Sequence, residues 1–217
     1  MVLFKDPTEQ YSVIFIVVAF VLDIILHLIP DLRPLIIRLT ELNLFLMSSL
    51  VFAFGLLNNH RNLTGFTFWS LITMLCTFLL AVTGINTGIF FGSFEYGYTL
   101  PTTLADVPLI VPLNWAMLLL SAYGFLTNAV TQRNLRALLA SILVLLLNFL
   151  IQPVGVKLGY WSWDLGTIPF QNYLSWFVVS LIFTQILAFM KIHARSVIFK
   201  TYLIMQFLFY GLLNVFL

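Results

Sequence analysis

Seven long apolar stretches, separated by short segments with Pro, Gly, Asn or charged residues, constrain this chain more than any other feature. A helix that crosses a bilayer needs roughly 20 predominantly apolar residues, and stretches of about that length fill most of the sequence. They predict helices at residues 11–29, 35–57, 65–83, 107–127, 135–152, 174–190 and 197–217. We therefore expect an all-α fold, a polytopic membrane bundle of about seven transmembrane helices, forming one integral membrane domain over residues 1–217.

Charged residues are too few to cover a water-facing surface. They make up 8% of the chain, against 61% hydrophobic residues, whereas soluble domains carry about 25% charged residues. The net charge of +2 is small and dispersed, so nucleic acid is not an expected partner. Composition indicates membrane lipid as the partner, and a homo-oligomer stays open. Because the helices leave no length for a soluble catalytic domain, any chemistry must occur in or at the bilayer.

Lysine and arginine residues are distributed unequally between the two ends of the predicted helices. One end carries Lys5, Arg61, Arg133, Arg136, Lys191, Arg195 and Lys200, and the other carries Arg33, Arg38 and Lys157. Cytoplasmic loops are enriched in Lys and Arg, so we expect a cytoplasmic N-terminus in a bacterial inner membrane. The two long connections, residues 84–106 and 153–173, then face away from the cytoplasm.

These two connections combine aromatic rings with acids. They contain Phe90, Phe91, Phe94, Tyr96, Tyr98, Tyr160, Trp161 and Trp163, and also Glu95, Asp106 and Asp164. A simple interpretation is the aromatic belt that membrane proteins have at the interface. Three acids and Gly-rich turns among the rings are more than a belt requires, and they favour a functional site.

A weak repeat follows the two connections. Pro108–Trp115 and Pro169–Trp176 have Pro, Leu and Trp at the same offsets, and each leads into an apolar helix. Two predicted crossings separate the copies, so both lie on the same side of the membrane. We infer two similarly oriented helix–loop–helix units related by an axis along the membrane normal.

Each acid in the two connections has a structural and a catalytic interpretation. Asp106 stands two residues before Pro108, where a carboxylate either caps the next helix or acts as an acid or base at the mouth of a pocket. Glu95 has aromatic neighbours, which would favour its protonated form, as a proton donor requires. Asp164 either makes a turn or belongs to the same site.

Asp23 and His27 lie four residues apart in the first predicted helix, so they share a face and can pair. Ionisable residues at membrane depth are costly and usually functional. One interpretation is structural, with His27 near the interface and Asp23 held by a polar partner in the bundle. The other is a proton relay or part of a polar pocket.

Several cofactor chemistries lack their motifs. The three histidines His27, His60 and His193 are too scattered for a di-iron cluster, and no Gly-rich nucleotide-binding motif occurs. We therefore expect no metal and no cofactor, which leaves redox-neutral chemistry or none.

Two motifs occur in order in the central half of the chain: Thr83–Leu100 with Val107–Trp115, and Pro153–Trp163 with Ile168–Trp176. They resemble the carotenoid biosynthesis protein family of acyclic carotenoid hydratases. The resemblance implies a multi-spanning membrane enzyme that adds water across the terminal C1–C2 double bond of an acyclic carotenoid such as lycopene, giving a tertiary alcohol. The chain departs from the family pattern at Gln152, where an acid is implied, and at Pro101, where Gly is implied.

Alkene hydration needs a proton donor, a positioned water and protection for a carbocation. On this basis we predict Glu95 or Asp106 as the general acid, with Asp164 or Gln152 holding the water. Ring faces attract cations, so the predicted substrate-binding residues are Tyr96, Tyr98, Trp115, Trp161, Trp163 and Trp176, with Asn114 and Asn172 as polar supports. Two alternatives stay open: a redox-neutral carotenoid cyclase or isomerase, and a non-enzymatic carotenoid- or lipid-binding protein or transporter.

Overall fold

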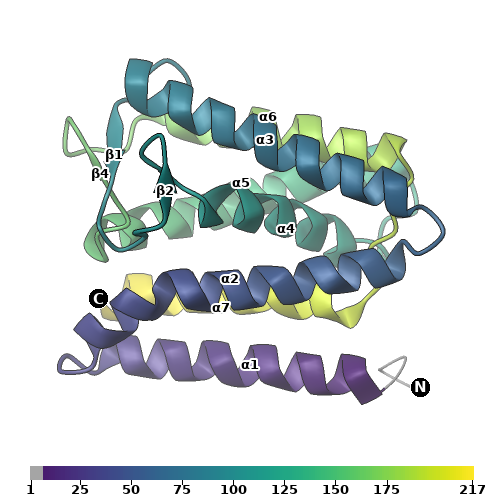
Figure 1. Ribbon diagram of the computed structural model, residues 1–217, viewed down its shortest axis with the longest axis horizontal. Coiled ribbons are helices and arrows are strands. Elements are labelled where there is room, and N and C mark those ends of the chain that lie inside the picture. Colours follow the sequence, from purple (N-terminus) through teal and green to yellow (C-terminus); the bar gives the residue numbers. More distant parts are fainter. Residues whose placement is uncertain (1–6) are drawn as a thin grey trace.

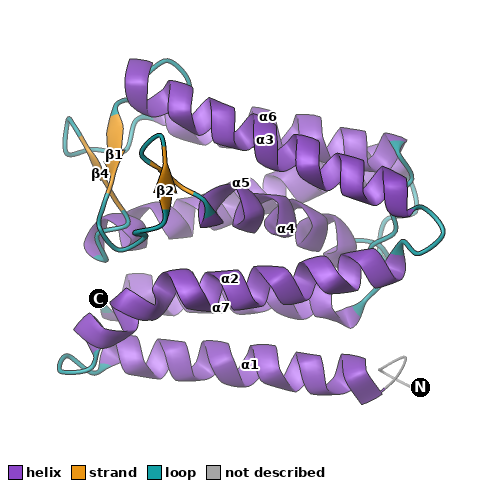
Figure 2. Ribbon diagram, viewed as in Figure 1, coloured by secondary structure: helices purple, strands orange, loops and turns teal. Residues whose placement is uncertain are grey.

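The computed structural model describes residues 7–217 and is built mainly of helices (Figure 1). The described residues form helices α1 (Pro7–Leu28), α2 (Arg33–Asn58), α3 (Leu63–Thr87), α4 (Ile110–Phe125), α5 (Arg133–Lys157), α6 (Phe170–Phe189) and α7 (Val197–Phe216). Four short strands lie in the connections (Figure 2): β1 (Phe94–Tyr96), β2 (Thr103–Leu104), β3 (Val107–Pro108) and β4 (Trp161–Trp163). The predicted all-α membrane bundle is confirmed. Lys5, one of the basic residues used to predict orientation, lies outside the described residues.

Six of these helices are long and apolar enough to span a membrane, and α4 is the exception. Its 16 residues extend about 24 Å, less than the roughly 30 Å of a hydrocarbon core. Helix α4 contacts α2, α3, α5, α6 and α7, and its residues 116–124 are all buried. A helix that is apolar on every side is stable in such a central position. The predicted crossing at 107–127 is therefore a shorter, central helix.

The interior of the bundle combines an apolar core with small polar side chains, and large apolar side chains also cover its outside. Hydroxyl groups of Ser48, Ser121 and Ser180 are fully buried between helices. On the outer face of α3, by contrast, Leu71 and Leu75 are more than half exposed. Small polar residues at helix contacts and leucines on the periphery are the pattern expected where lipid is the solvent.

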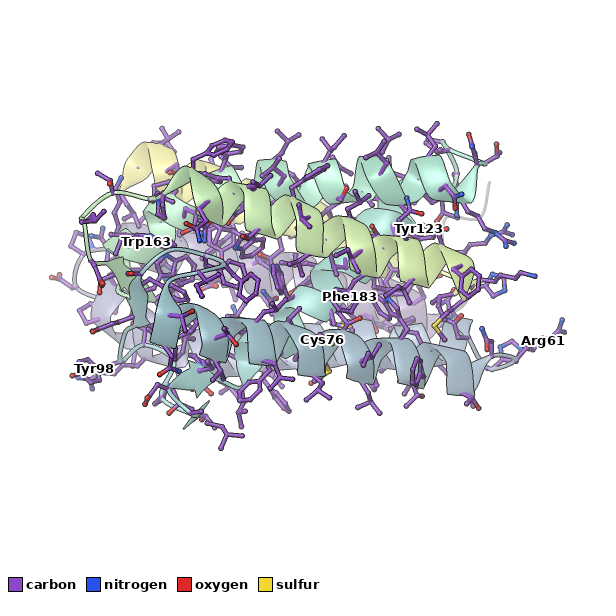
Figure 3. The ribbon with its side chains drawn as sticks, turned by 90° about the horizontal axis from the view of Figure 1, so that it is seen from above. Arg61, Cys76, Tyr98, Tyr123, Trp163 and Phe183 are labelled. Carbon is purple, nitrogen blue, oxygen red and sulfur yellow. The ribbon has the colours of Figure 1, made fainter. Side chains whose placement is uncertain are left out.

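The long connections and the short α2–α3 turn lie at opposite ends of the bundle. Tyr98 and Arg61 mark these two ends in Figure 3, and helix α1 begins at the end opposite to the one where α7 finishes (Figure 1). At the Arg61 end, Asn59 joins two turns: its Nδ2 donates to the His193 carbonyl over 2.9 Å, and its Oδ1 accepts from the His193 N–H over 2.7 Å. This contact fixes α2 and α3 relative to α6 and α7.

Two features of the fold differ from the sequence prediction in a way that affects the site: the end of α5 and the structure of the long connections. Helix α5 does not end at residue 152 but continues through Pro153 to Lys157. Burial of Ile151 and Val154 on either side offsets the backbone hydrogen bond that a proline removes. The connections expected to be loops also contain paired strands, since β1 and β4 form an antiparallel ribbon. Both changes bring the aromatic segments over the end of the bundle.

Candidate active site

The β1–β4 ribbon puts four aromatic rings on one face. Its register pairs Phe94 with Trp163 and Tyr96 with Trp161. Side chains alternate between the faces of a strand, so these four rings point to the bundle. The Phe94 and Trp163 rings are 5.3 Å apart between centroids. Two segments that lie far apart in the sequence thus form a single aromatic wall.

The same alternation turns the predicted general acid away from this wall. Glu95 lies between Phe94 and Tyr96, pairs with Ser162 across the ribbon, and is exposed. The prediction that Glu95 lies in apolar surroundings is therefore wrong.

Three further predicted residues also lie outside the pocket that this wall covers. Asp106 is exposed in the tight β2–β3 turn with a left-handed φ of 61°. Leu109 is the N-cap of α4 and makes no side-chain capping hydrogen bond, so the interpretation of Asp106 as a helix cap is wrong. Asp164 is exposed in the turn after β4, and Tyr98 is fully exposed.

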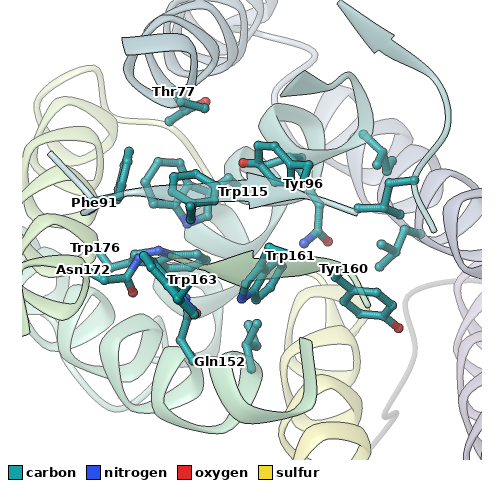
Figure 4. Close-up of a pocket in the computed structure, with 18 of the residues that line it drawn as sticks. Thr77, Phe91, Tyr96, Trp115, Gln152, Tyr160, Trp161, Trp163, Asn172 and Trp176 are labelled. Atoms are coloured by element: carbon teal, nitrogen blue, oxygen red, sulfur yellow. The ribbon is translucent and has the colours of Figure 1, made fainter. Parts of the chain in front are cut away.

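A cavity of about 90 Å³ lies between the ribbon and the helices. At the roughly 30 Å³ that each water occupies in the liquid, it has room for about three waters or for a small branched apolar group. Its lining includes eight of the predicted residues: Tyr96, Asn114, Trp115, Gln152, Trp161, Trp163, Asn172 and Trp176 (Figure 4). Among the described residues, none that lines it is an Asp or a Glu.

The two halves of the predicted repeat meet in this cavity. Trp115 at the start of α4 and Trp176 at the start of α6 make an edge-to-face contact, with centroids 4.7 Å apart. Phe91 adds a further ring at 6.0 Å from Trp115. The sequence repeat therefore corresponds to a direct contact between equivalent tryptophans.

A chain of buried amides closes the cavity on the α5–α6 side. Asn148 Nδ2 donates to Asn172 Oδ1 over 3.2 Å, and Gln152 Nε2 donates to Asn148 Oδ1 over 2.8 Å. All three side chains are at most 3% exposed. This hydrogen-bonded chain ends at Gln152, whose acceptor atom Oε1 has no hydrogen-bond partner among residues 7–217. The cavity thus presents a fixed hydrogen-bond acceptor.

Donors are present beside this acceptor. The indole N–H groups of Trp115, Trp161 and Trp163 are buried and have no partner within the described part of the chain. Buried polar groups are costly unless they are hydrogen-bonded, and indole nitrogen is only a donor. The amide oxygen and two such N–H groups are enough to satisfy one hydroxyl group, which donates one hydrogen bond and accepts two.

A second polar cluster lies behind the cavity, between α1 and α2. Asp23 and His27 are buried and pair over 3.2 Å, and Asn43 Nδ2 donates to Asp23 Oδ2 over 2.7 Å. Asn43 lies three residues after Thr40 on α2, and the Thr40 hydroxyl is 3.5 Å from the phenol of Tyr160, which lines the cavity. The predicted Asp23–His27 contact is confirmed, and this part of α2 connects it with the lining of the cavity.

Hydrogen bonds also hold residues on the α2 and α7 side of the cavity. Tyr202 Oη donates to Asn114 Oδ1 over 2.5 Å, and Tyr160 Oη lies 3.5 Å from the Thr40 hydroxyl. In the connections, burial raises the pKa of both Tyr96 and Tyr160 well above the ordinary tyrosine value. Their phenols stay neutral and can serve only as hydrogen-bonding groups or as ring faces.

Sequence reasoning missed several of the lining and supporting residues. Asn148 could have been found, since it lies four residues before Gln152 in an apolar helix and amides at that spacing share a face. Tyr210 gives no such signal, because only the packing of α7 brings it to the cavity.

Fold and site together define an integral membrane protein with an aromatic, amide-containing pocket at one end of its helical bundle. Residues 39–217 match the family model described as carotenoid biosynthesis protein, and the chain belongs to this family. All residues that line the pocket fall within that range, whereas Asp23 and His27 precede it.

Bisanhydrobacterioruberin hydratase of Haloarcula japonica is 31% identical to this chain over 110 residues. The aligned part is 47% of this chain and 38% of that protein, so well under two thirds of the relative is matched. No solved structure matches the chain significantly.

Proposed function

We propose that this protein is a carotenoid hydratase that adds water to the terminal C1–C2 double bond of an acyclic carotenoid end group. The observation that carries the proposal is the pocket, in which aromatic rings surround one amide acceptor and three indole donors. Family membership supports carotenoids as the substrate class. The relative that is named as a hydratase supports water addition as the reaction.

The pocket supplies two of the three requirements of alkene hydration. The rings of Trp115, Trp163 and Trp176 line the cavity, and ring faces stabilise a tertiary carbocation by cation–π attraction. A water held by Gln152 Oε1 and an indole N–H is positioned to attack that cation. Gln152 thus acts as the water-holding residue, and the amide chain through Asn148 to Asn172 keeps its orientation fixed.

We assign the proton source to the Asp23–His27 cluster. Asp23 is a buried carboxylate behind the pocket and accepts from Asn43, which lies three residues after Thr40 on α2; the Thr40 hydroxyl is 3.5 Å from the phenol of Tyr160, which lines the cavity. The proton passes to C2 of the alkene, C1 becomes the cation, and the water oxygen bonds to C1. The proton that this water loses returns to the cluster, so the net reaction adds one water and needs no oxidant or reductant.

Expression of the protein in a lycopene-producing bacterium tests the reaction. Products heavier by one or two waters are expected, with tertiary alcohols at the chain ends. A cyclised or isomerised product of unchanged mass would favour a cyclase or isomerase. Unaltered lycopene from well-inserted protein would refute the hydratase proposal.

Single substitutions then separate the candidate acids. Asp23→Asn is expected to lower the hydration rate at least about a hundredfold, the usual contribution of a general acid. Glu95→Gln, Asp106→Asn and Asp164→Asn are matched carboxylate-to-amide controls at exposed positions and should retain nearly full activity. Full activity of Asp23→Asn together with loss in one of the other three would transfer the role to that loop acid.

A second candidate function rests on the absence of Asp and Glu from the described lining of the pocket. A carotenoid-binding protein needs the aromatic walls but no proton donor. Pigment that copurifies with the protein without turnover, and that is retained in all four carboxylate variants, would favour this function.

A further inference from the structure

A second, larger hollow adjoins the pocket on the outer side of the bundle. It has a volume of about 600 Å³ and lies between α2 and α3, over the start of α4. Its lining is mostly apolar, with Leu42, Phe45, Met74, Leu109, Ile110 and Leu113, and it has Arg38, Glu41 and Thr102 as polar members. We refer to these nine residues as the α2/α3 groove.

The groove exists because α2 and α3 pack on α4 and only sparsely on each other. Figure 1 shows α2 and α3 in different layers, with α4 between and behind them. Large side chains therefore stay uncovered along the groove: Leu42 and Phe45 are 54% and 52% exposed. Six of the nine groove residues are apolar, so the space favours an extended hydrocarbon.

Ile110 connects the groove to the pocket, because it lines both. This side chain is 4% exposed and stands at the first position of α4. Leu44 lines the pocket from the same stretch of α2 that supplies Leu42 and Phe45 to the groove. The two spaces are thus adjacent, with the Ile110 side chain as their shared wall.

The size of the pocket requires such a second space. A cavity of about 90 Å³ holds an end group, but not a polyene about as long as the roughly 30 Å hydrocarbon core. The rest of the polyene must therefore leave the pocket past one of the lining side chains, and that side chain must be one that a hydrocarbon can displace. Ile110 is the residue that lies between the pocket and an apolar groove.

We propose that the α2/α3 groove binds the polyene arm of a long acyclic carotenoid whose end group occupies the aromatic pocket, with Ile110 at the junction. The proposal rests on the carotenoid substrate class proposed above. Apolar side chains hold the arm. The apolar part of the groove ends at Arg38, Glu41 and Thr102, where Glu41 Oε2 accepts a hydrogen bond from the Thr102 N–H over 3.2 Å. An ordinary lipid acyl chain is the competing occupant.

Tryptophan substitutions in the groove test this proposal in the full-length protein. Leu42→Trp and Met74→Trp fill the groove, while Leu46→Trp and Leu79→Trp place the same side chain on exposed positions of α2 and α3 outside it. Lycopene copurified per mole of protein is expected to fall about tenfold in the two groove variants and to stay unchanged in the two controls. Equal yield and thermal stability of the four proteins establish that all are folded.

A short acyclic isoprenoid hydrocarbon with the same terminal alkene, small enough for the pocket alone, separates this proposal from the proposed reaction. Groove variants should hydrate the short hydrocarbon at the normal rate and lose only the binding and turnover of the long carotenoid. Equal retention and turnover of lycopene in groove variants and controls would overturn the groove proposal. Failure of the wild-type protein to hydrate either compound would refute the reaction, while pigment retention would still test the groove.

Alkylation gives a second measurement that does not depend on a bulky side chain. In a Cys76→Ala background, Leu42→Cys should react with a membrane-permeant maleimide in lycopene-free membranes and be protected when lycopene is present. Leu46→Cys should react equally in both membranes. Equal reactivity of the Leu42→Cys protein with and without lycopene would contradict binding in the groove.

Discussion

Gly155 allows the ring of Trp161 to lie directly on helix α5, and its replacement by alanine is the sharpest structural test of the pocket. A Cβ atom at this position would lie 2.3 Å from Trp161 Cζ2 and 2.7 Å from Cε2 and Cη2. The indole would have to withdraw by about 1.1 Å to reach the 3.4 Å at which ordinary contact begins. Trp161 also pairs with Tyr96 through the ribbon, so this withdrawal would displace the aromatic wall.

The expected magnitude follows from two opposing effects. Overpacking of a well-packed site costs about 1–3 kcal/mol, while Gly to Ala inside a helix contributes up to about 1 kcal/mol of stability. Gly211→Ala in α7 is the matched control, since its Cβ would meet nothing within 4 Å. The difference between the two variants cancels the helix effect, and should therefore equal the overpacking cost of about 1–3 kcal/mol.

Two assays measure this difference. Thermal unfolding in detergent, followed by tryptophan fluorescence, should give Gly155→Ala a lower midpoint than Gly211→Ala. If the protein is a hydratase, a displacement of about 1 Å should also lower its rate, by up to about a hundredfold. Trp161→Phe in the Gly155→Ala background removes the clashing atoms and should restore part of the stability. Equal stability and equal rates for the two alanine variants would refute the described position of Trp161.

Other predictions concern the ends of the bundle and the phenols. Asn59→Leu removes the contacts to His193 and should lower the free energy of unfolding by about 2–3 kcal/mol; an unchanged unfolding midpoint would contradict this. Ser196→Ala removes the cap of Ile198 N and the hydroxyl contact to Glu9, for an expected loss of about 1–2 kcal/mol in the same assay. Burial raises the pKa of Tyr96 in the folded protein, so above the ordinary tyrosine pKa of about 10 the unfolded chain binds fewer protons than the folded one. Stability should then be unaffected by this group below pH 10 and fall above it, and Tyr96→Phe should make the fall shallower in unfolding measured from pH 9 to 11.

The positions of the acids show where sequence reasoning reached its limit. Glu95 was predicted as a proton donor because of its aromatic neighbours, yet the same neighbours take the inner face of a strand and leave Glu95 on the outer face. The Phe-Glu-Tyr and Trp-Ser-Trp runs have the period of two that predicts this alternation, but each run is too short to identify a strand without its partner. Asp23 and His27 could be paired from their spacing alone. That α2 connects them with the lining of the pocket depends on how the helices pack.

The sequence by itself determined that this is a helical membrane protein, and it predicted eight of the aromatic and amide residues that line the pocket. These properties depend on local composition and on spacing along one helix. Only the tertiary structure decided which side chains face the cavity, that Tyr210 belongs to the site, and that a groove adjoins it. The reason is physical: the β1–β4 register and the packing of α2 and α3 on α4 are contacts between distant segments, and no spacing along the chain encodes them.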